Sequence, residues 1–172
     1  HKSKLCDLAP SREYKMKLQT ELKLKPQDQQ IDYASKVVLL GSCFAENIGA
    51  KFKYFKFQTL QNPFGILFHP KAIEALIVNA VEDKQYTEDD IFFNNEQWHC
   101  YDAHSKLSTP SKEGLLEALN DGLKNTRAHL TEASHIIITL GTAWVYNTIE
   151  SNTTVANCHK VPQKQFGKKL LS

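Results

Sequence analysis

The sequence predicts an α/β protein built around a parallel sheet. Two largely apolar runs, Lys36–Leu40 (KVVLL) and His135–Leu140 (HIIITL), are rich in β-branched side chains and are each followed by a glycine and a hydroxyl residue. Continuous apolar runs of this length are typical of strands that are covered on both faces. Segments with helical periodicity separate the strands, and this alternation favours parallel crossover connections. We therefore expect both runs to be fully buried strands of one sheet.

The remaining elements are predicted from periodicity and turn residues. A helix should follow the first buried run, because Phe44, Ile48 and Phe52 recur every four residues and would face the core. The other expected helices and turns are a turn at Asn62–Gly65, a helix near Lys71–Val81 opened by His69-Pro70, an acidic loop at Thr87–Asp90, a long helix from Ser111 through Leu130 and a helix from Lys164 to Ser172. The other expected strands are an edge strand over Met16–Leu24, a short strand at Phe57–Leu60 and two β-hairpins, Ile91–Phe93 with Gln97–Tyr101 and Trp144–Thr148 with Thr153–Cys158.

Two features bear on the extent of the domain. The only methionine is Met16, so we interpret residues 1–15 as an extension or tag-like segment outside the fold. The last expected helix has no cap before Ser172, and about three buried parallel strands are few for a doubly wound sheet. We therefore expect residues 16–172 to be the N-terminal part of a domain that is truncated at its C-terminus.

Composition excludes several classes of function. The chain has 172 residues, and 21 Lys and Arg nearly balance 19 Asp and Glu, which gives no electrostatic footprint for nucleic acid or a membrane surface. No apolar run reaches the roughly 20 residues of a membrane-spanning helix. The four cysteines (Cys6, Cys43, Cys100, Cys158) form no CxxC pair, so we expect reduced, buried thiols rather than disulfides or a zinc site. The sequence predicts a soluble, cytoplasmic protein that needs no metal or other cofactor.

A Gly-Ser step directly follows the first buried run, in LLGSCFAEN. Side chains at the carboxyl end of a parallel strand project into the crevice where open α/β sheets bind ligands, and the next helix directs backbone N–H groups to the same place. Ser42 is therefore either a nucleophile with oxyanion donors nearby or simply the N-cap of the helix. The next residue, Cys43, should point away from the crevice, and we expect it to be a buried structural thiol.

Five short motifs occur in a recognisable order. They are GSCFA at Gly41–Ala45, NPFG at Asn62–Gly65, HS at His104-Ser105, LGTAW at Leu140–Trp144 and NCHKVP at Asn157–Pro162. In this order they resemble the GSCFA domain family, a branch similar to the SGNH/GDSL hydrolases, from about Met16 to Ser172. The resemblance implies a flavodoxin-like parallel sheet of the SGNH-hydrolase type with β-hairpin insertions. It also implies a serine hydrolase of ester bonds, for example of O-acyl groups on a carbohydrate.

The resemblance implies roles for the first two motifs. Ser42 would be the nucleophile. The backbone of Gly41-Ser42-Cys43 and the N–H of Gly65 would surround the oxyanion, together with the side-chain amide of Asn62. An Asx turn before the following proline is an equally good role for Asn62.

The later blocks of the SGNH hydrolases match only in part. Gly141-Thr142 stands in the place of their Gly-x-Asn-Asp block but lacks its asparagine. That oxyanion donor is therefore either missing or replaced by the Thr142 hydroxyl or by Asn62. The Asp-x-x-His pair that supplies the general base has no counterpart after His159. We expect the base either beyond the end of this chain or at His104 or His159, which lie in polar loops.

Two further functions use the same crevice. The departures from the SGNH blocks fit a non-catalytic domain that binds a small molecule or carbohydrate, and acyl transfer would need the same nucleophile as hydrolysis. The expected partner is in each case a small-molecule or carbohydrate ester. The lysines near the end of the chain either contact an acidic substrate or form a solvated helix face; they are Lys160, Lys164, Lys168 and Lys169.

Overall fold

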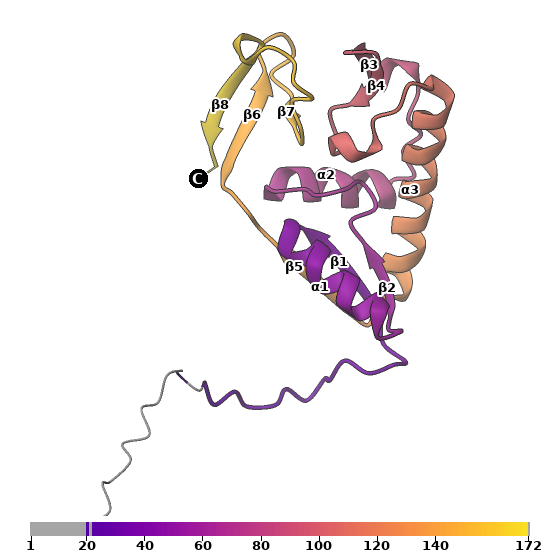
Figure 1. Cartoon of the computed structure of the whole chain (residues 1–172), viewed down its shortest axis with the longest axis vertical. Helices are drawn as coiled ribbons and strands as arrows, with labels where there is room; N and C mark the ends of the chain where they lie inside the picture. The colour runs from indigo at the N-terminus through magenta and orange to yellow at the C-terminus, as the bar shows by residue number, and fades with distance from the viewer. Residues whose placement is uncertain (1–19, 21, 172) are drawn as a thin grey trace, which may run out of the picture. The chain divides into compact units, whose positions relative to one another are not determined.

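The computed structural model describes residues 20 and 22–171, and the chain divides into two units, residues 1–30 and 31–172. In the first unit, residues 20 and 22–30 contain no helix or strand, and Leu22 and Leu24 are exposed. The edge strand expected over Met16–Leu24 is thus not found at residues 20 and 22–24, and its other positions lie outside the described residues. All elements labelled in Figure 1 belong to the second unit.

A three-stranded parallel sheet with the strand order β2-β1-β5 lies at the centre of the second unit. The strand β1 (Lys36–Gly41) pairs with β2 (Gln58–Gln61) on one side and with β5 (His135–Thr139) on the other. Gly41 lies opposite Thr139 in this register, so the segments that follow β1 and β5 leave the sheet at the same edge. The predicted α/β class and both buried-run strands are confirmed.

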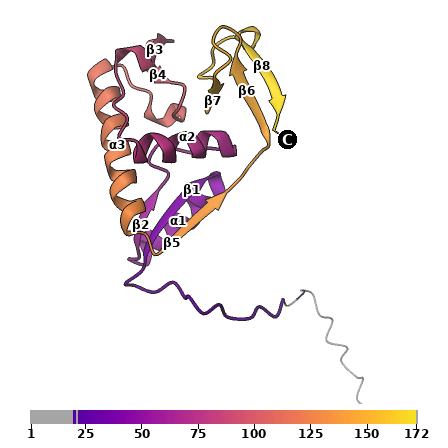
Figure 2. The same ribbon diagram turned by 180° about the vertical axis from the view of Figure 1, so that it is seen from behind.

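Helices cover both faces of β1 (Figures 1 and 2). On one face, Val37 and Leu39 pack with Ala45 of the helix α1 (Cys43–Tyr54). On the other face, Val38 and Leu40 join the larger core. That core includes residues of the helices α2 (Pro70–Val81) and α3 (Lys112–Glu132). The three helices α1, α2 and α3 are confirmed as predicted. The strand β1 is buried on both faces because helices pack against each face of it.

Two predictions about burial are wrong. The strand β5 is not fully buried, because it lies at the edge of the sheet and only the face turned to α1 is covered, so Ile136 and Ile138 remain half exposed. Phe44 does not face the core either. It lies in the first turn of α1 and is exposed, whereas Ile48 and Phe52 pack against the core as predicted.

The rest of the unit consists of hairpins and short helices. A hairpin is formed by β3 (Ile91–Asn94) with β4 (Gln97–Cys100), and an antiparallel sheet by β7 (Thr154–Val155), β6 (Trp144–Thr148) and β8 (Phe166–Leu170). The 3₁₀ helices are η1 (Glu88–Asp90), η2 (Ser105–Leu107) and η3 (Gln163–Gln165). Both predicted hairpins are confirmed. The helix predicted from Lys164 to Ser172 is wrong, because residues 166–170 instead pair with the free edge of β6, which supplies hydrogen bonds that an isolated helical turn lacks.

The NPFG turn is anchored through its phenylalanine. Phe64 is fully buried, and its ring lies 5.8 Å from the ring of Tyr86. A Cβ on Gly122 of α3 would lie 3.0 Å from the same ring, so the glycine allows the turn to approach the helix closely. This packing fixes the turn beside the carboxyl end of β1.

Candidate active site

The turn between β1 and α1 holds Ser42 against the end of β5. Gly41 has a φ of +127°, and a Cβ at this position would lie 2.0 Å from the carbonyl oxygen of Thr139, so only glycine fits. The N–H of Ser42 donates to the carbonyl oxygen and to Oγ1 of Thr139, each at 3.0 Å. Ser42 therefore stands at the carboxyl end of the central strand in a fixed backbone geometry.

The Ser42 hydroxyl has two partners among the described residues. Its Oγ accepts a hydrogen bond from the N–H of Phe44 at 3.3 Å, which makes Ser42 the N-cap of α1. It also shares a hydrogen bond with the Thr139 hydroxyl, with the oxygens 2.9 Å apart. The role of Thr139 was not predicted, although a hydroxyl residue at the end of the second apolar run was a visible signal.

Asn62 links the NPFG turn to the Ser42 turn. Its Oδ1 accepts a hydrogen bond from the N–H of Gly41 at 2.9 Å, and its Nδ2 donates to the carboxylate of Glu46 at 3.0 Å. The buried amide thus joins two segments instead of closing a local Asx turn. The N–H of Gly65 donates to the carbonyl oxygen of Asn62 at 2.8 Å, so this expected oxyanion donor has a partner within the turn.

Gly141 and Thr142 lie on the other side of Ser42. Their N–H groups donate to the carbonyl oxygen of Phe68 at 2.8 and 3.1 Å, and the Thr142 hydroxyl accepts from the N–H of Trp144 at 3.0 Å. A Cβ on Gly141 would lie 3.6 Å from Cβ of Ser42 and 2.9 Å from Cδ1 of Phe68. The structure therefore places Gly141 next to Ser42 and adds Phe68, which the sequence analysis did not single out.

Cys43 is exposed and not the buried thiol that we expected. It is the first residue of α1, where a side chain faces solvent because the sheet lies behind the helix. Its backbone N–H has no hydrogen-bond partner among the described residues, so it is available to an oxyanion. Cys100 is buried as expected, and burial raises the pKa of its thiol to about 12.

His104 is brought to the NPFG turn rather than to Ser42 directly. A Cβ on Gly65 would lie 2.6 Å from Cβ of His104, and the N–H of His104 donates to the carbonyl oxygen of Phe64 at 2.9 Å. Its Nδ1 accepts from the N–H of Lys106 at 3.2 Å, so the neutral ring carries its proton on Nε2.

The surroundings of His104, its burial above all, keep the ring neutral at neutral pH. Burial lowers its pKa, and the Lys106 charge acts in the same direction, whereas the Glu46 carboxylate opposes both. Because Nδ1 is already an acceptor, the group that His104 offers to a ligand is the Nε2–H donor. The structure thus favours a hydrogen-bond donor over a general base at this position.

Glu46, which the sequence analysis missed, organises the polar side of the site. Its carboxylate accepts from Nδ2 of Asn62 and, at 3.0 Å, from the ammonium of Lys106. These hydrogen bonds, that from Asn62 above all, lower its pKa against the effect of burial. The three side chains line a cleft of about 490 Å³ together with Lys53, Phe57, Thr59 and Gln61.

His159 belongs to a different part of the structure. Its side chain is only 3% exposed, its Nε2 donates to the carbonyl oxygen of Cys100 at 2.7 Å, and its ring lies 4.7 Å from that of His99. Burial lowers its pKa to about 4, and its Nδ1 has no hydrogen-bond partner in the described part of the chain. None of these contacts is shared with Ser42, so the structure does not join the two residues.

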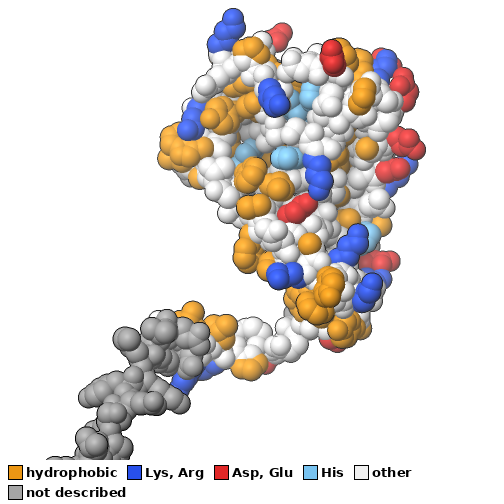
Figure 3. Space-filling model, in the orientation of Figure 1, with side chains coloured by type: hydrophobic (Ala, Val, Ile, Leu, Met, Phe, Trp, Pro, Cys, Tyr) orange, Lys and Arg blue, Asp and Glu red, His pale blue; other side chains and the backbone are white. Residues whose placement is uncertain are grey.

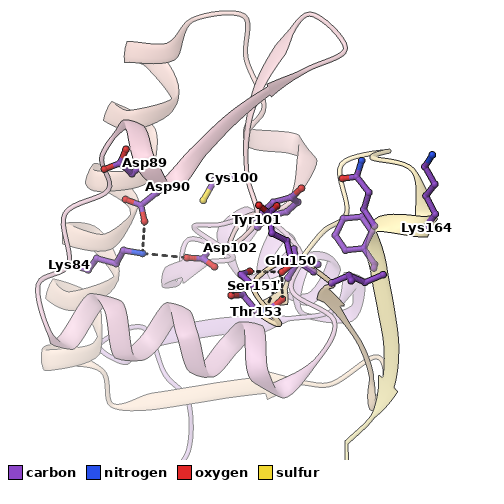
Figure 4. Close-up of a pocket in the computed structure, with 15 residues that line it drawn as sticks. Lys84, Asp89, Asp90, Cys100, Tyr101, Asp102, Glu150, Ser151, Thr153 and Lys164 are labelled. Carbon is purple, nitrogen blue, oxygen red and sulfur yellow. Dashed lines mark hydrogen bonds and ion pairs between the residues drawn. The ribbon is translucent and has the colours of Figure 1, made fainter.

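A cavity of about 830 Å³ lies between the β3–β4 hairpin and the β6–β8 strands (Figure 4). Lys84 forms ion pairs in its wall with Asp90 at 3.0 Å and Asp102 at 3.7 Å. None of the hydrogen-bond partners of Ser42 lines it. Within residues 20 and 22–171, no three His, Cys, Asp or Glu side chains gather in a way that would hold a metal ion.

The fold and the Ser42 turn define an α/β protein with a hydroxyl group at the carboxyl end of its central parallel strand. The chain belongs to the GSCFA family, whose model matches residues 36–172. No curated protein and no solved structure matches the chain. No helix in the described part of the chain is long and apolar enough to cross a membrane.

Proposed function

We propose that this protein hydrolyses ester bonds with Ser42 as the nucleophile. The observation that carries the proposal is the position of Ser42 Oγ, which is held at the carboxyl end of β1 by the N–H of Phe44 and the hydroxyl of Thr139. Hydrogen bonds from these donors to an alkoxide are stronger than those to a neutral hydroxyl, and the N-terminus of α1 favours negative charge. The similarity of the motifs to those of SGNH hydrolases supports the same residue.

The chemistry would run in two steps. Ser42 Oγ attacks the carbonyl carbon of the ester while its proton passes to a general base, and the alcohol leaves with a proton. Water then attacks the acyl-serine, which releases the carboxylic acid and restores the hydroxyl. The N–H of Cys43 and Nε2–H of His104 are the donors proposed for the oxyanion, because Gly41 and Gly65 donate within the protein.

A binding domain without catalysis is the alternative, and one observation favours it. The partners of Ser42 Oγ among the described residues are a backbone N–H and a threonine hydroxyl, neither of which accepts a proton at neutral pH. In this case the crevice would hold a small-molecule or carbohydrate ester without cleaving it. Acyl transfer differs from hydrolysis only in the second step, where an alcohol replaces water.

The proposal is tested with a fluorophosphonate probe, and the labelled peptide is identified by mass spectrometry. We expect labelling at Ser42, and its loss together with the loss of p-nitrophenyl ester hydrolysis in Ser42→Ala. The matched control is Ser111→Ala, since Ser111 caps α3 in the same way, through a hydrogen bond from the N–H of Gly114 at 3.0 Å. Each substitution removes a cap worth about 1 kcal/mol.

The two variants separate a cap from a nucleophile. Ser111→Ala should lose stability and keep both labelling and hydrolysis. Undiminished turnover in Ser42→Ala would refute the proposal, and so would equal losses in the two variants. Binding of an ester without its turnover in the wild-type protein would favour the binding domain.

A further inference from the structure

We infer that the site takes esters with an apolar acyl group larger than acetyl, held by the rings of Phe44 and Phe68, and a polar alcohol. The inference rests on the proposed function of Ser42 and adds to it the class of substrate. It follows from the different chemistry of the two sides of the Ser42 turn. The strand order β2-β1-β5 puts Asn62, which follows β2, on one side of the turn and Gly141, which follows β5, on the other. The segment after Asn62 crosses the end of β1, where the N–H of Leu67 donates to the carbonyl oxygen of Gly41, and reaches Gly141 at Phe68.

The side of the turn next to Gly141, where Phe68 meets the end of β5, is apolar. The ring edge of Phe68 and Cβ of Ser42 both lie within 3.6 Å of the point where a Cβ on Gly141 would be. Because glycine has no side chain, nothing at position 141 stands between the ring and the serine. Phe68 is 39% exposed and Leu140 is 59% exposed, so both present apolar surface to a bound molecule.

Phe44 adds a second aromatic ring next to the nucleophile. Its backbone N–H donates the hydrogen bond to Ser42 Oγ, at 3.3 Å, by which Ser42 caps the helix, and Phe44 is 60% exposed. Phe44 belongs to neither core cluster of the described residues, and an exposed apolar group next to a binding site is stabilised when a ligand covers it. Figure 3 shows hydrophobic side chains beside histidine and charged side chains on the face that carries α1.

The side that follows β2 is polar. Asn62, Glu46 and Lys106 line the cleft of about 490 Å³ there, and their hydrogen bonds hold one another in place. An alcohol with hydroxyl groups is suited to these donors and acceptors, and an alkyl chain is not. The acyl group is therefore assigned to the side of Phe68 and the alcohol to the side of Glu46.

The experiment compares short and long acyl groups at the same serine. Two fluorophosphonates, one with a methyl and one with an octyl chain, are used for labelling, and p-nitrophenyl acetate and octanoate for turnover. We expect the octyl probe to label Ser42 at least about tenfold faster, since each methylene in an apolar pocket strengthens binding. Phe44→Ala and Phe68→Ala should lower the octyl rate to about the methyl rate and change the methyl rate less than about twofold.

Phe55→Ala is the matched control. Phe55 is 57% exposed and is the C-cap residue just beyond the other end of α1, so its loss removes a similarly exposed ring far from Ser42 along the same helix axis. Equal rates for the two probes would overturn the inference, and so would a loss of chain-length preference in Phe55→Ala. Circular dichroism of each variant confirms that the fold is kept.

A binding measurement separates this inference from the proposed function. Octanoate is titrated into the Ser42→Ala variant and followed by NMR shifts of the Phe44 and Phe68 rings. Octanoate binding that is present in Ser42→Ala and lost in the double variant with Phe68→Ala supports the apolar subsite. If in addition no probe labels Ser42 in the wild-type protein, the proposed nucleophile is refuted and the subsite is not. Absence of octanoate binding together with labelling of Ser42 by both probes at equal rates overturns the subsite alone.

Discussion

Acid should destabilise the folded protein through His159. Burial holds the pKa of this ring at about 4 in the folded state, below the ordinary value of 6.5 that it has in the unfolded chain. Between these values the unfolded state binds more protons, so the free energy of unfolding falls as the pH drops through 6.5 and continues to fall until about pH 4. The difference in pKa sets an upper limit of about 3 kcal/mol, and above about pH 7 this residue contributes no pH dependence.

Urea unfolding at a series of pH values measures the effect. The test variant is His159→Asn, because asparagine tolerates the positive φ of 49° at this position and does not titrate. We expect the variant to be less stable than the wild type near pH 7, because the substitution removes the packing against His99. Its free energy of unfolding should depend less on pH below pH 6.5. His129→Asn removes an exposed histidine and serves as the control. A wild-type slope that persists in His159→Asn and disappears in His129→Asn would refute the reasoning.

Substitutions at three further positions test the geometry of the site. Gly41→Ala should cost more than about 4 kcal/mol in urea unfolding or prevent folding, because its Cβ would overlap the carbonyl oxygen of Thr139. Asn62→Ala should cost about 2 kcal/mol by the same measurement, since it leaves the buried N–H of Gly41 without a partner. His104→Gln should keep the ester turnover within about tenfold because an amide N–H replaces Nε2–H, whereas His104→Leu should lower kcat about 100-fold. Equal losses in the two His104 variants would contradict the donor role.

Periodicity and turn residues predicted most elements of the second unit because these signals are local. The hairpin at β3–β4 and the cap of α3 by Ser111 depend on neighbours within a few positions. The strand β8 was missed for the opposite reason: its partner β6 lies about 20 positions earlier, and pairing with that free edge overrides a weak helical pattern. The exposure of β5 likewise depends on its position at the edge of the sheet, and a local sequence pattern does not indicate the strand order.

The motif residues of the site were expected from the sequence, whereas the side chains that hydrogen-bond to them were not. The sequence indicated that Ser42, Asn62 and Gly141 meet at one edge of the sheet, and the structure brings all three together. It did not indicate Thr139 or Glu46, since a hydroxyl and a carboxylate on a strand and a helix are common and acquire meaning only through their partners. Asn62 also shows why the role of a motif residue cannot be assigned from its residue type alone, because its side-chain amide is hydrogen-bonded to Gly41 and Glu46.

The hydrogen bonds of Ser42 make its role as a cap compatible with the role of nucleophile that we propose for it. Oγ1 of Thr139 accepts from the N–H of Ser42 and also shares a hydrogen bond with Oγ of Ser42, in which either hydroxyl can be the donor. When Thr139 is the donor, Oγ of Ser42 accepts from Thr139 and from Phe44, and its own proton can pass to a base. Both donors point at the atom that becomes negative, so the contacts that fold the turn are also those that stabilise an alkoxide. A serine that only capped a helix would need the Phe44 contact and not the one to Thr139.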